Sequence, residues 1–549
     1  MPTRLIDVGE PEGEKYARLV ITRTSEIQAP YLALSYCWGK SMQSNICLRD
    51  ENLAELQSYI NEEQLARTHR DVFQLARDLG FRYVWIDALC IVQGNSEDWA
   101  YESKTMAQVY GNAALTIIAG RAADSGEGFL ENRLRPVVGP CAIPFNNTFY
   151  YQGTKKVWGE SKTGAMGNIW VSLPRSGKDG PVSQRGWCFQ ELMLSSRALV
   201  FGEEQLHFQC QELRIQEDGR VQRSIPYRVQ HAYDAKYAPL NPGPKPSEAI
   251  KNVPRSPGPD DEEQTRRWLI FWYDAVLWQY TSKQLTNPTD IFAALSGLAQ
   301  IVKAKVCSRY LGGLWEVDMV RGLLWQPTHV KHFVGLPFMC ERRMAVVPSS
   351  QCDSNMQTEA VPVEVPSWSW AAIQGQVSLD WVNRREADYH ESAWQVRPKY
   401  QGQWTQDTAC QAAVVHIPRC ELEFFGRPRR ARCSPYPHGR ELNMKDKDKE
   451  KQARRRRTAM VVLMPFSENE PGQGAVTDCG SEDSNRVIAD GWFDVAEEVS
   501  STCWCLPLTK KRGLMLIRDE QNKFRRVGTV NVRDLEWMLS VEEEVVCLI

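Results

Sequence analysis

Short apolar runs alternate with helical patterns over the first 215 residues. The runs are Leu32–Tyr36, Tyr83–Ile86, Leu115–Ala119 and Ala198–Phe201, and amphipathic stretches such as "DVFQLARDLG" and "DWAYESKTMAQVYGNA" lie between them. Strands separated by helices of ten or more residues form βαβ units, whose neighbouring strands run parallel. The pattern therefore predicts an α/β domain over residues 1–215, with a parallel sheet flanked by helices.

The pattern changes after residue 215. Residues 216–265 are rich in Pro and charge, which predicts a linker or a long surface loop. Aromatic residues at helical spacing predict a helical segment over 266–325. Residues 326–549 contain short strand-like runs with many Trp, which predicts a larger C-terminal region of α+β or mainly β structure, interrupted by a basic insertion at 441–458.

That insertion holds the tract "KDKDKEKQARRRR", Lys445–Arg457. Its charge indicates a flexible solvated segment, and nuclear targeting or an RNA-binding arm stays open as an alternative. The whole chain, however, has 66 basic and 68 acidic residues and a net charge of −2. No global field would attract nucleic acid or an anionic membrane, so we expect neither as a partner.

Composition also bears on compartment and metal binding. The N-terminus lacks the apolar core of a signal peptide, and no stretch approaches the ~18 apolar residues of a membrane-spanning helix, so we expect a cytoplasmic protein. The sixteen Cys are then expected to be thiols, and none forms a C-x-x-C pair. His329 and His332 lie close in sequence but lack further ligands nearby, so we expect no metal site.

The common catalytic signatures are missing from the sequence. It contains no G-x-S-x-G, no G-x-x-x-x-G-K-[ST], no H-E-x-x-H, and no G-x-G-x-x-G after a strand. Hydrolase, kinase, zinc protease and dehydrogenase functions therefore lose their main support.

Three ordered blocks resemble those of the fungal heterokaryon incompatibility (HET) domain. They are "ALSYCWG" at Ala33–Gly39, "YVWIDALCIVQ" with "DWAYESKTMAQVYGNA" inside Tyr83–Ala113, and "RGWCFQE" at Arg185–Glu191. Flanking segments such as "LTNPTDIFAALSGLA" and "PSWSWA" are also similar to large proteins of this kind. Cys188 and Val92 depart from the family, which often has Thr and Asn there.

The resemblance implies a role in non-self recognition, in which fusion of genetically different fungal cells triggers growth arrest and programmed cell death. It implies other incompatibility proteins as partners, and self-association through the HET domain. The order of strands, helices and the "W-C-x-x-E-L" block is in turn similar to TIR domains, some of which cleave NAD⁺ with the Glu of that block. The matching residues are Trp187, Cys188, Glu191 and Leu192.

The TIR resemblance implies a flavodoxin-like parallel sheet, Glu191 as the catalytic residue and NAD⁺ as a substrate, with no cofactor. Loss of nicotinamide leaves an oxocarbenium-like ribosyl cation that a nearby carboxylate stabilises, as in glycoside hydrolysis. Nicotinamide leaves as a neutral group, so the reaction requires no general acid. One well-placed Glu would form the core of such a site.

Ligands of open α/β sheets bind outside the carboxyl ends of the strands. Ser35 and Tyr36 end the first predicted strand and Asp87 follows the second, so we expect them to meet the "RGWCFQE" turn at one rim. The candidate substrate-binding residues are Ser35, Tyr36, Asp87, Glu102, Arg185 and Trp187.

Each candidate also has a structural interpretation. Trp187 fits a core aromatic, Asp87 a turn cap, Glu102 a partner of an Arg, and Glu191 a salt bridge or a helix start. We expect Glu191 to be exposed. Two function classes remain open: an NAD⁺-cleaving enzyme, and a non-catalytic signalling module that self-associates and acts through partners.

Overall fold

The computed structural model describes most of the chain, in nineteen segments. These are residues 1–10, 16–25, 27–39, 46–131, 141–147, 149–152, 155–158, 165–171, 179–210, 213–223, 261–328, 340–348, 358–362, 365–379, 399–401, 421–435, 460–466, 486–542 and 544–549. They divide into two units, the first ending at residue 223 and the second beginning at 261. Most of the predicted linker at 216–265, the insertion at 441–458 and the pair His329 and His332 lie outside the described residues.

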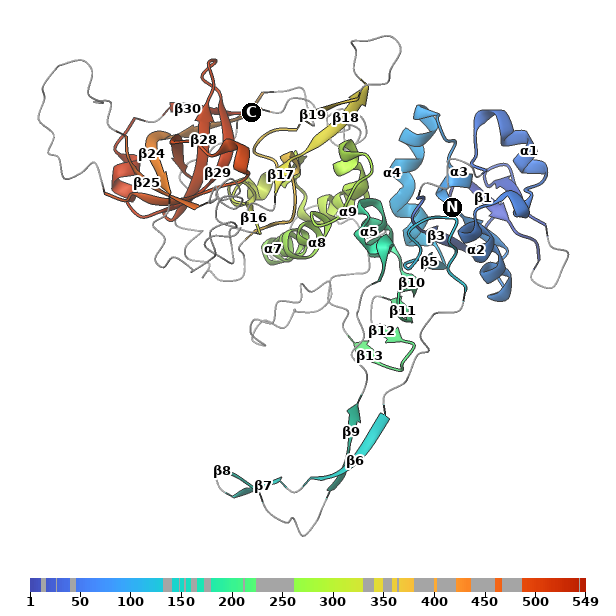
Figure 1. Ribbon diagram of the computed structural model, residues 1–549. Helices are drawn as coiled ribbons and strands as arrows, with labels where there is room; N and C mark the ends of the chain where they lie inside the picture. The colour runs from blue at the N-terminus through green and yellow to red at the C-terminus, as the bar shows by residue number, and fades with distance from the viewer. Residues whose placement is uncertain are drawn as a thin grey trace, which may run out of the picture. The chain divides into compact units, whose positions relative to one another are not determined.

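A nine-stranded mixed sheet forms the centre of the first unit (Figure 1). Its spatial order is β13 (Val221–Arg223), β12 (Leu213–Gln216), β11 (Leu206–Cys210), β10 (Arg197–Phe201), β5 (Leu115–Ile118), β3 (Tyr31–Ser35), β4 (Tyr83–Trp85), β1 (Arg4–Asp7) and β2 (Arg18–Ile21). The four strands in the middle, β10, β5, β3 and β4, pair in parallel and coincide with the four predicted runs. This part of the prediction is confirmed.

The edges of the sheet differ from the prediction. β1 and β2 on one side and β11, β12 and β13 on the other pair antiparallel. β11 follows β10 after residues 202–205, and β13 follows β12 after residues 217–220. These connections are too short for the crossover that parallel pairing requires, whereas the parallel strands are joined through helices. A wholly parallel sheet is therefore wrong, and a parallel centre with antiparallel edges is what the chain forms.

Five helices accompany this sheet: α1 (Leu53–Ser58), α2 (Arg67–Asp78), α3 (Asp87–Cys90), α4 (Ser96–Asn112) and α5 (Gly186–Leu194). α2 is amphipathic and buries Val72 and Phe73. α4 begins where the Asn95 side chain accepts hydrogen bonds from two backbone N–H groups of its first turn. α5 consists mostly of apolar residues and is buried along most of its length.

A pair of nested hairpins is inserted between β5 and α5. β6 (Cys141–Asn147) pairs with β9 (Ala165–Val171), and β7 (Phe149–Gln152) pairs with β8 (Lys155–Trp158). These strands project from the rest of the first unit (Figure 1). The sequence patterns did not predict them. The insertion separates the first two HET-like blocks from the third, so α5 packs near the sheet although it is far from β5 in sequence.

The second unit starts with helices and continues with strands. α7 (Asp261–Ile270) runs through a π-helical stretch at Phe271–Leu277 into α8 (Trp278–Tyr280), and α9 (Ser296–Val306) follows. The later strands form a nine-stranded antiparallel sheet with one parallel contact, in the order β22-β23-β30-β29-β26-β25-β24-β27-β28. Their bounds are β22 (Lys399–Gln401), β23 (Glu421–Gly426), β24 (Arg429–Pro435), β25 (Met460–Pro465), β26 (Ala489–Phe493), β27 (Thr502–Pro507), β28 (Arg512–Arg518), β29 (Phe524–Val532) and β30 (Glu544–Leu548).

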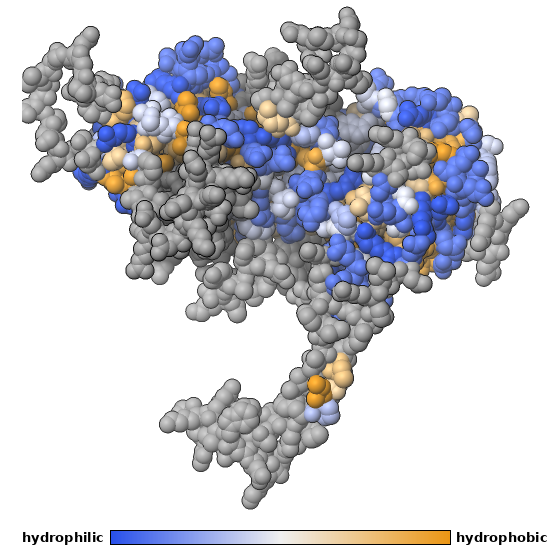
Figure 2. Space-filling model, in the orientation of Figure 1, coloured by the Kyte–Doolittle hydropathy of each residue, from blue (hydrophilic) through white to orange (hydrophobic). Residues whose placement is uncertain are grey.

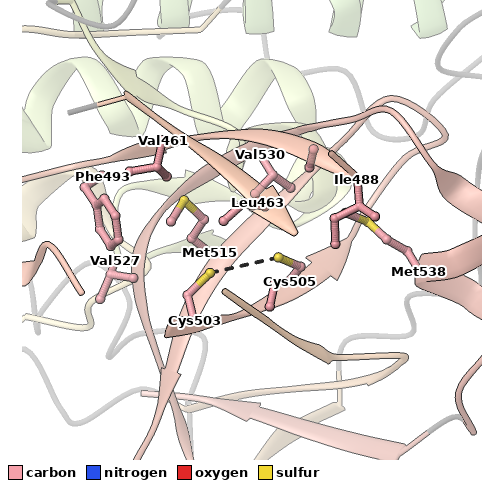
Figure 3. Packing of buried hydrophobic residues seen from close by; sticks show 12 residues of the cluster. Val461, Leu463, Ile488, Phe493, Cys503, Cys505, Met515, Val527, Val530 and Met538 are labelled. Atoms are coloured by element: carbon pink, nitrogen blue, oxygen red, sulfur yellow. Dashed lines mark hydrogen bonds between the residues drawn. The ribbon is translucent and has the colours of Figure 1, made fainter. Parts of the chain in front are cut away.

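Six of these strands close into a cylinder, because β29 pairs with β28 as well as with β26. The interior is filled by apolar side chains, among them Leu463, Phe493 and Met515 (Figure 3). The thiols of Cys503 and Cys505 lie in this core with their sulfur atoms 4.0 Å apart. This closed sheet agrees with the predicted β structure of the C-terminal region.

Arg526 joins this closed sheet to an earlier segment of the second unit. Its side chain is fully buried and forms an ion pair with Asp494, with Nε 2.9 Å from Oδ2. Nη1 donates to the carbonyl oxygen of Leu323 at 2.5 Å, and Nη2 donates to the carbonyl oxygen of Trp325 at 2.6 Å and to Asp494 Oδ1 at 3.2 Å. The guanidinium also lies 3.4 Å from the centroid of the Trp325 ring. One buried residue thus donates hydrogen bonds to two backbone carbonyl groups and one carboxylate.

Candidate functional site

The candidate site lies at the carboxyl ends of the central parallel strands. Ser35 is the last residue of β3, and Asp87 opens α3 just after β4. Arg185 precedes α5, and its Nη1 donates a hydrogen bond to the backbone oxygen of Tyr36 at 2.8 Å. The thiol of Cys188 also reaches this oxygen, at 3.8 Å. The start of α5 is therefore tied to the end of β3.

Glu191 lies inside this arrangement. Its side chain is close to Ser35, Asp87, Arg185 and Cys188, and the residue is only 5% exposed. The pKa of Glu191 is raised to about 7, because burial and, to a smaller extent, the charge of Asp87 raise it more than Ser35 and the Arg185 guanidinium lower it. The prediction that Glu191 is exposed is wrong, because α5 packs with nearly all of its residues buried.

Asp87 is the second carboxylate of the cluster. Its Oδ2 accepts a hydrogen bond from Trp38 Nε1 at 2.7 Å, and its Oδ1 accepts one from the backbone N–H of Ala88 at 2.7 Å. Burial raises the pKa of Asp87, whereas these hydrogen bonds, Arg185 and Tyr36 lower it. The Asp87 carboxylate therefore accepts a hydrogen bond from the first turn of α3 and is also part of the cluster.

Two hydroxyl groups face these carboxylates. Ser35 Oγ and Tyr36 Oη are buried, and within the described part of the chain neither has a partner with full hydrogen-bond geometry. They nevertheless lie near enough to lower the pKa values of Glu191 and Asp87, respectively. Two acidic groups, two hydroxyls and one guanidinium thus share a largely dry site.

The ring of Tyr36 packs edge-to-face against His69 of α2, with ring centroids 5.1 Å apart. His69 is fully buried, and neither of its ring nitrogens has a hydrogen-bond partner among the residues that the structure describes. Burial lowers the pKa of His69 to about 3, so the ring is neutral. Sequence reasoning missed His69, because a single polar residue in an amphipathic helix gives no signal. Trp38 lies inside the first HET-like block, and the sequence favours a core aromatic there over a ligand contact.

Trp187 and Glu102 occupy other positions. Trp187 is half-buried, and its ring packs edge-to-face against Trp99 of α4 with centroids 6.4 Å apart. Glu102 is buried and lies 3.5 Å from the guanidinium of Arg4, which also pairs with Asp98. The structure therefore brings Ser35, Tyr36, Asp87, Arg185 and Glu191 together, with Trp187 on the same helix, and places Glu102 in a separate cluster.

The chemistry available to this cluster follows from its charges. A carboxyl group with a pKa of about 7 is present in both protonation states near neutral pH, so it can exchange a proton or stabilise a neighbouring cation. Among the residues that the structure describes, no group of three or more His, Cys, Asp or Glu side chains could hold a metal ion. Within the same residues, no helix combines the length and apolar character needed to cross a membrane.

Comparison with known proteins supports the sequence resemblance. The sequence model of the family described as heterokaryon incompatibility protein (HET) matches residues 31–191. The match begins at the first residue of β3 and ends at Glu191, so it spans the whole cluster. No curated protein and no solved structure matches the chain. The resemblance to the HET domain is thus confirmed over these residues.

Proposed function

We propose that this chain is a heterokaryon incompatibility-type protein of non-self recognition, and that its first unit causes cell death by cleaving NAD⁺ at Glu191. The observation that carries the proposal is the buried Glu191 carboxyl, with its pKa of about 7, at the carboxyl ends of the parallel strands. The four parallel strands follow the spatial order β4-β3-β5-β10. Numbered along the chain this is 2-1-3-4, the order of flavodoxin-like sheets, whose ligands bind where the order reverses, here between β3 and β5.

In the proposed reaction the bond between the ribose C1′ and the nicotinamide nitrogen breaks. Its electron pair leaves with neutral nicotinamide, and the ionised Glu191 carboxylate stabilises the ribosyl cation. A water molecule then adds to C1′ and loses its proton to the carboxylate or to solvent. The half-buried Trp187 precedes Glu191 by one helical turn on α5, and its ring would stack on the nicotinamide. The positive charge of Arg185 would balance the negative charge of the carboxylates.

One observation favours the second function class. Glu191 is 5% exposed and Arg185 ties α5 to β3, so the same cluster would also suit a structural core beneath a signalling surface. In that case the domain self-associates and acts through other incompatibility proteins, without chemistry of its own. Both proposals place the protein in the cytoplasm.

A direct assay separates the two proposals. The purified full chain is incubated with NAD⁺ at high protein concentration, and nicotinamide release is followed by chromatography. If Glu191 stabilises the ribosyl cation, Glu191→Gln should lower the rate by ~100-fold or more. Glu102→Gln, a change at a buried carboxyl of the other cluster, is the matched control and should keep most of the activity.

The same variants are then expressed in yeast or in a filamentous fungus. Under the enzymatic proposal, Glu191→Gln abolishes cell death and NAD⁺ loss together. Cell death with no NAD⁺ loss by the wild-type chain would reject the enzyme and favour the signalling module.

A further inference from the structure

A cavity of about 610 Å³ opens on the first unit, between α4 and the segments that flank β1 and β2. Its wall includes Thr22, Arg23, Gln28, Tyr101, Thr105 and Gln108. The volume lies in the range of small-molecule sites. None of these residues belongs to the Glu191 cluster, so the cavity is a separate feature of the domain.

The side chains of Arg23 and Tyr101 form a hydrogen-bonded pair at the rim of the cavity. Arg23 Nη2 donates a hydrogen bond to the Tyr101 hydroxyl at 2.7 Å, and the guanidinium lies 5.9 Å from the ring centroid. Arg23 is exposed, and Tyr101 keeps 46% of its surface exposed, which is unusual for an aromatic residue. No carboxylate in the described part of the chain forms an ion pair with Arg23, so its charge is available to a ligand.

One wall of the cavity carries the hydroxyl group of Thr105. This hydroxyl donates a hydrogen bond to the backbone oxygen of Glu102 at 2.9 Å and lies 3.5 Å from Oε2 of the same residue. Glu102 itself is only 1% exposed, is paired with Arg4 and does not line the cavity. The oxygen of the Thr105 hydroxyl can still accept a hydrogen bond from a ligand.

The side walls add two amide groups. Gln28 and Gln108 are exposed, and no described hydrogen bond uses their side chains. A primary amide presents a donor and an acceptor side by side, which matches the paired acceptor and donor on the edge of adenine. On the face seen in Figure 2 the first unit is mostly hydrophilic, with only small scattered hydrophobic areas.

We propose that this cavity binds a purine mononucleotide, with its phosphate on Arg23, its base stacked on Tyr101 and its ribose hydroxyls toward Thr105. A guanidinium suits phosphate because its donors match the phosphate oxygens, and an exposed aromatic ring gives a base a stacking platform. The amides of Gln28 and Gln108 read the edge of an adenine base. The proposal goes beyond the function of the Glu191 cluster, since it requires neither NAD⁺ nor cleavage.

Calorimetric titration of the full chain with adenosine monophosphate tests the proposal. Tyr101→Ala and Arg23→Gln should each weaken binding about tenfold or more, because each removes one anchor of the ligand. Arg70→Gln, which changes an exposed arginine on α2, is the matched control and should bind like the wild type. Adenosine lacks the phosphate, and ribose 5-phosphate lacks the base. Each should bind about tenfold more weakly than the nucleotide.

The outcomes of this titration are distinct from those of the NAD⁺ assay. Glu191→Gln should keep nucleotide binding, and Arg23→Gln should keep NAD⁺ cleavage. The proposal is overturned if adenosine monophosphate does not bind at about 1 mM, or if the Arg23 and Tyr101 variants bind it like the wild type. It is also overturned if Glu191→Gln alone abolishes binding, which would place the nucleotide at the other cluster.

Discussion

Replacing Glu191 by Gln should stabilise the first unit at pH 8 and change it little at pH 5. The Glu191 carboxyl has a pKa of about 7 in the folded chain, against an ordinary value of 4.5, mainly because burial disfavours its charged form. Because the fold favours the neutral carboxyl, the stability that this group contributes to the folded state is fully present below pH 4.5 and is lost as the pH rises through 7. Gln has nearly the same shape and carries no charge, so it avoids this loss.

The size of the effect follows from the two pKa values. The difference between about 7 and 4.5, at about 1.4 kcal/mol per pH unit, corresponds to about 3 kcal/mol at pH 8. At pH 5 the wild type is mostly protonated in the fold, and the two proteins should differ by less than about 1 kcal/mol. For a domain of this size, 3 kcal/mol corresponds to a difference in melting temperature of roughly 10 °C.

The assay is thermal unfolding of the full chain between pH 5 and pH 8, followed by circular dichroism and calorimetry so that the two units can be separated. Glu203→Gln, at an exposed position after β10, is the control and should follow the wild type at each pH. Equal pH dependence of the wild type and Glu191→Gln would show that the carboxyl is not buried as described. Loss of stability in Glu191→Gln at pH 8 would show that its ionised form is held by Arg185 more strongly than burial opposes it.

Three further changes test other parts of the structure. Trp38→Phe removes the hydrogen bond that the indole gives to the carboxylate at the start of α3, and carboxyl NMR titration should show the pKa of that carboxylate rising. Arg526→Met leaves Asp494 buried and unpaired, so urea unfolding should show that the second unit loses about 3–5 kcal/mol of unfolding free energy. An equal loss after both partners are replaced by apolar residues would contradict this explanation. Gly180→Ala should lower the melting temperature more than Gly219→Ala: both glycines have a φ of +84°, but only at Gly180 would the added Cβ lie 2.2 Å from a backbone oxygen.

The sequence predicted the centre of the first sheet because its strands carry continuous apolar runs. Every residue of β3 is buried, so no alternation with polar positions blurs the pattern. β12, by contrast, reads "LRIQ" and is half exposed, and the nested hairpins β6–β9 carry mixed polar and apolar residues. Short edge strands and hairpins gave too little hydrophobic signal to be predicted.

The candidate site shows the same division. Ser35 and Asp87 were predicted as neighbours because both follow parallel strands, and a parallel sheet brings such ends together. The burial of Glu191 was not predicted, because it depends on how tightly α5 packs, and the helix sequence alone does not reveal that. His69 enters the site only through the position of α2 beside Tyr36, a tertiary contact that local patterns do not encode.

The hydrogen bond between Arg185 and Tyr36 also has a consequence for the time at which the cluster is assembled. The two residues are 149 positions apart, and the inserted hairpins are synthesised between them. At ribosomal rates of about 5–20 residues per second, the chain carries β3 and β4 for on the order of ten seconds before α5 exists. During that interval Asp87 has neither Arg185 nor Glu191 beside it, so the cluster is completed only after most of the first unit has been made. Chains that end prematurely before α5 therefore lack the cluster, whatever reaction or signal it supports.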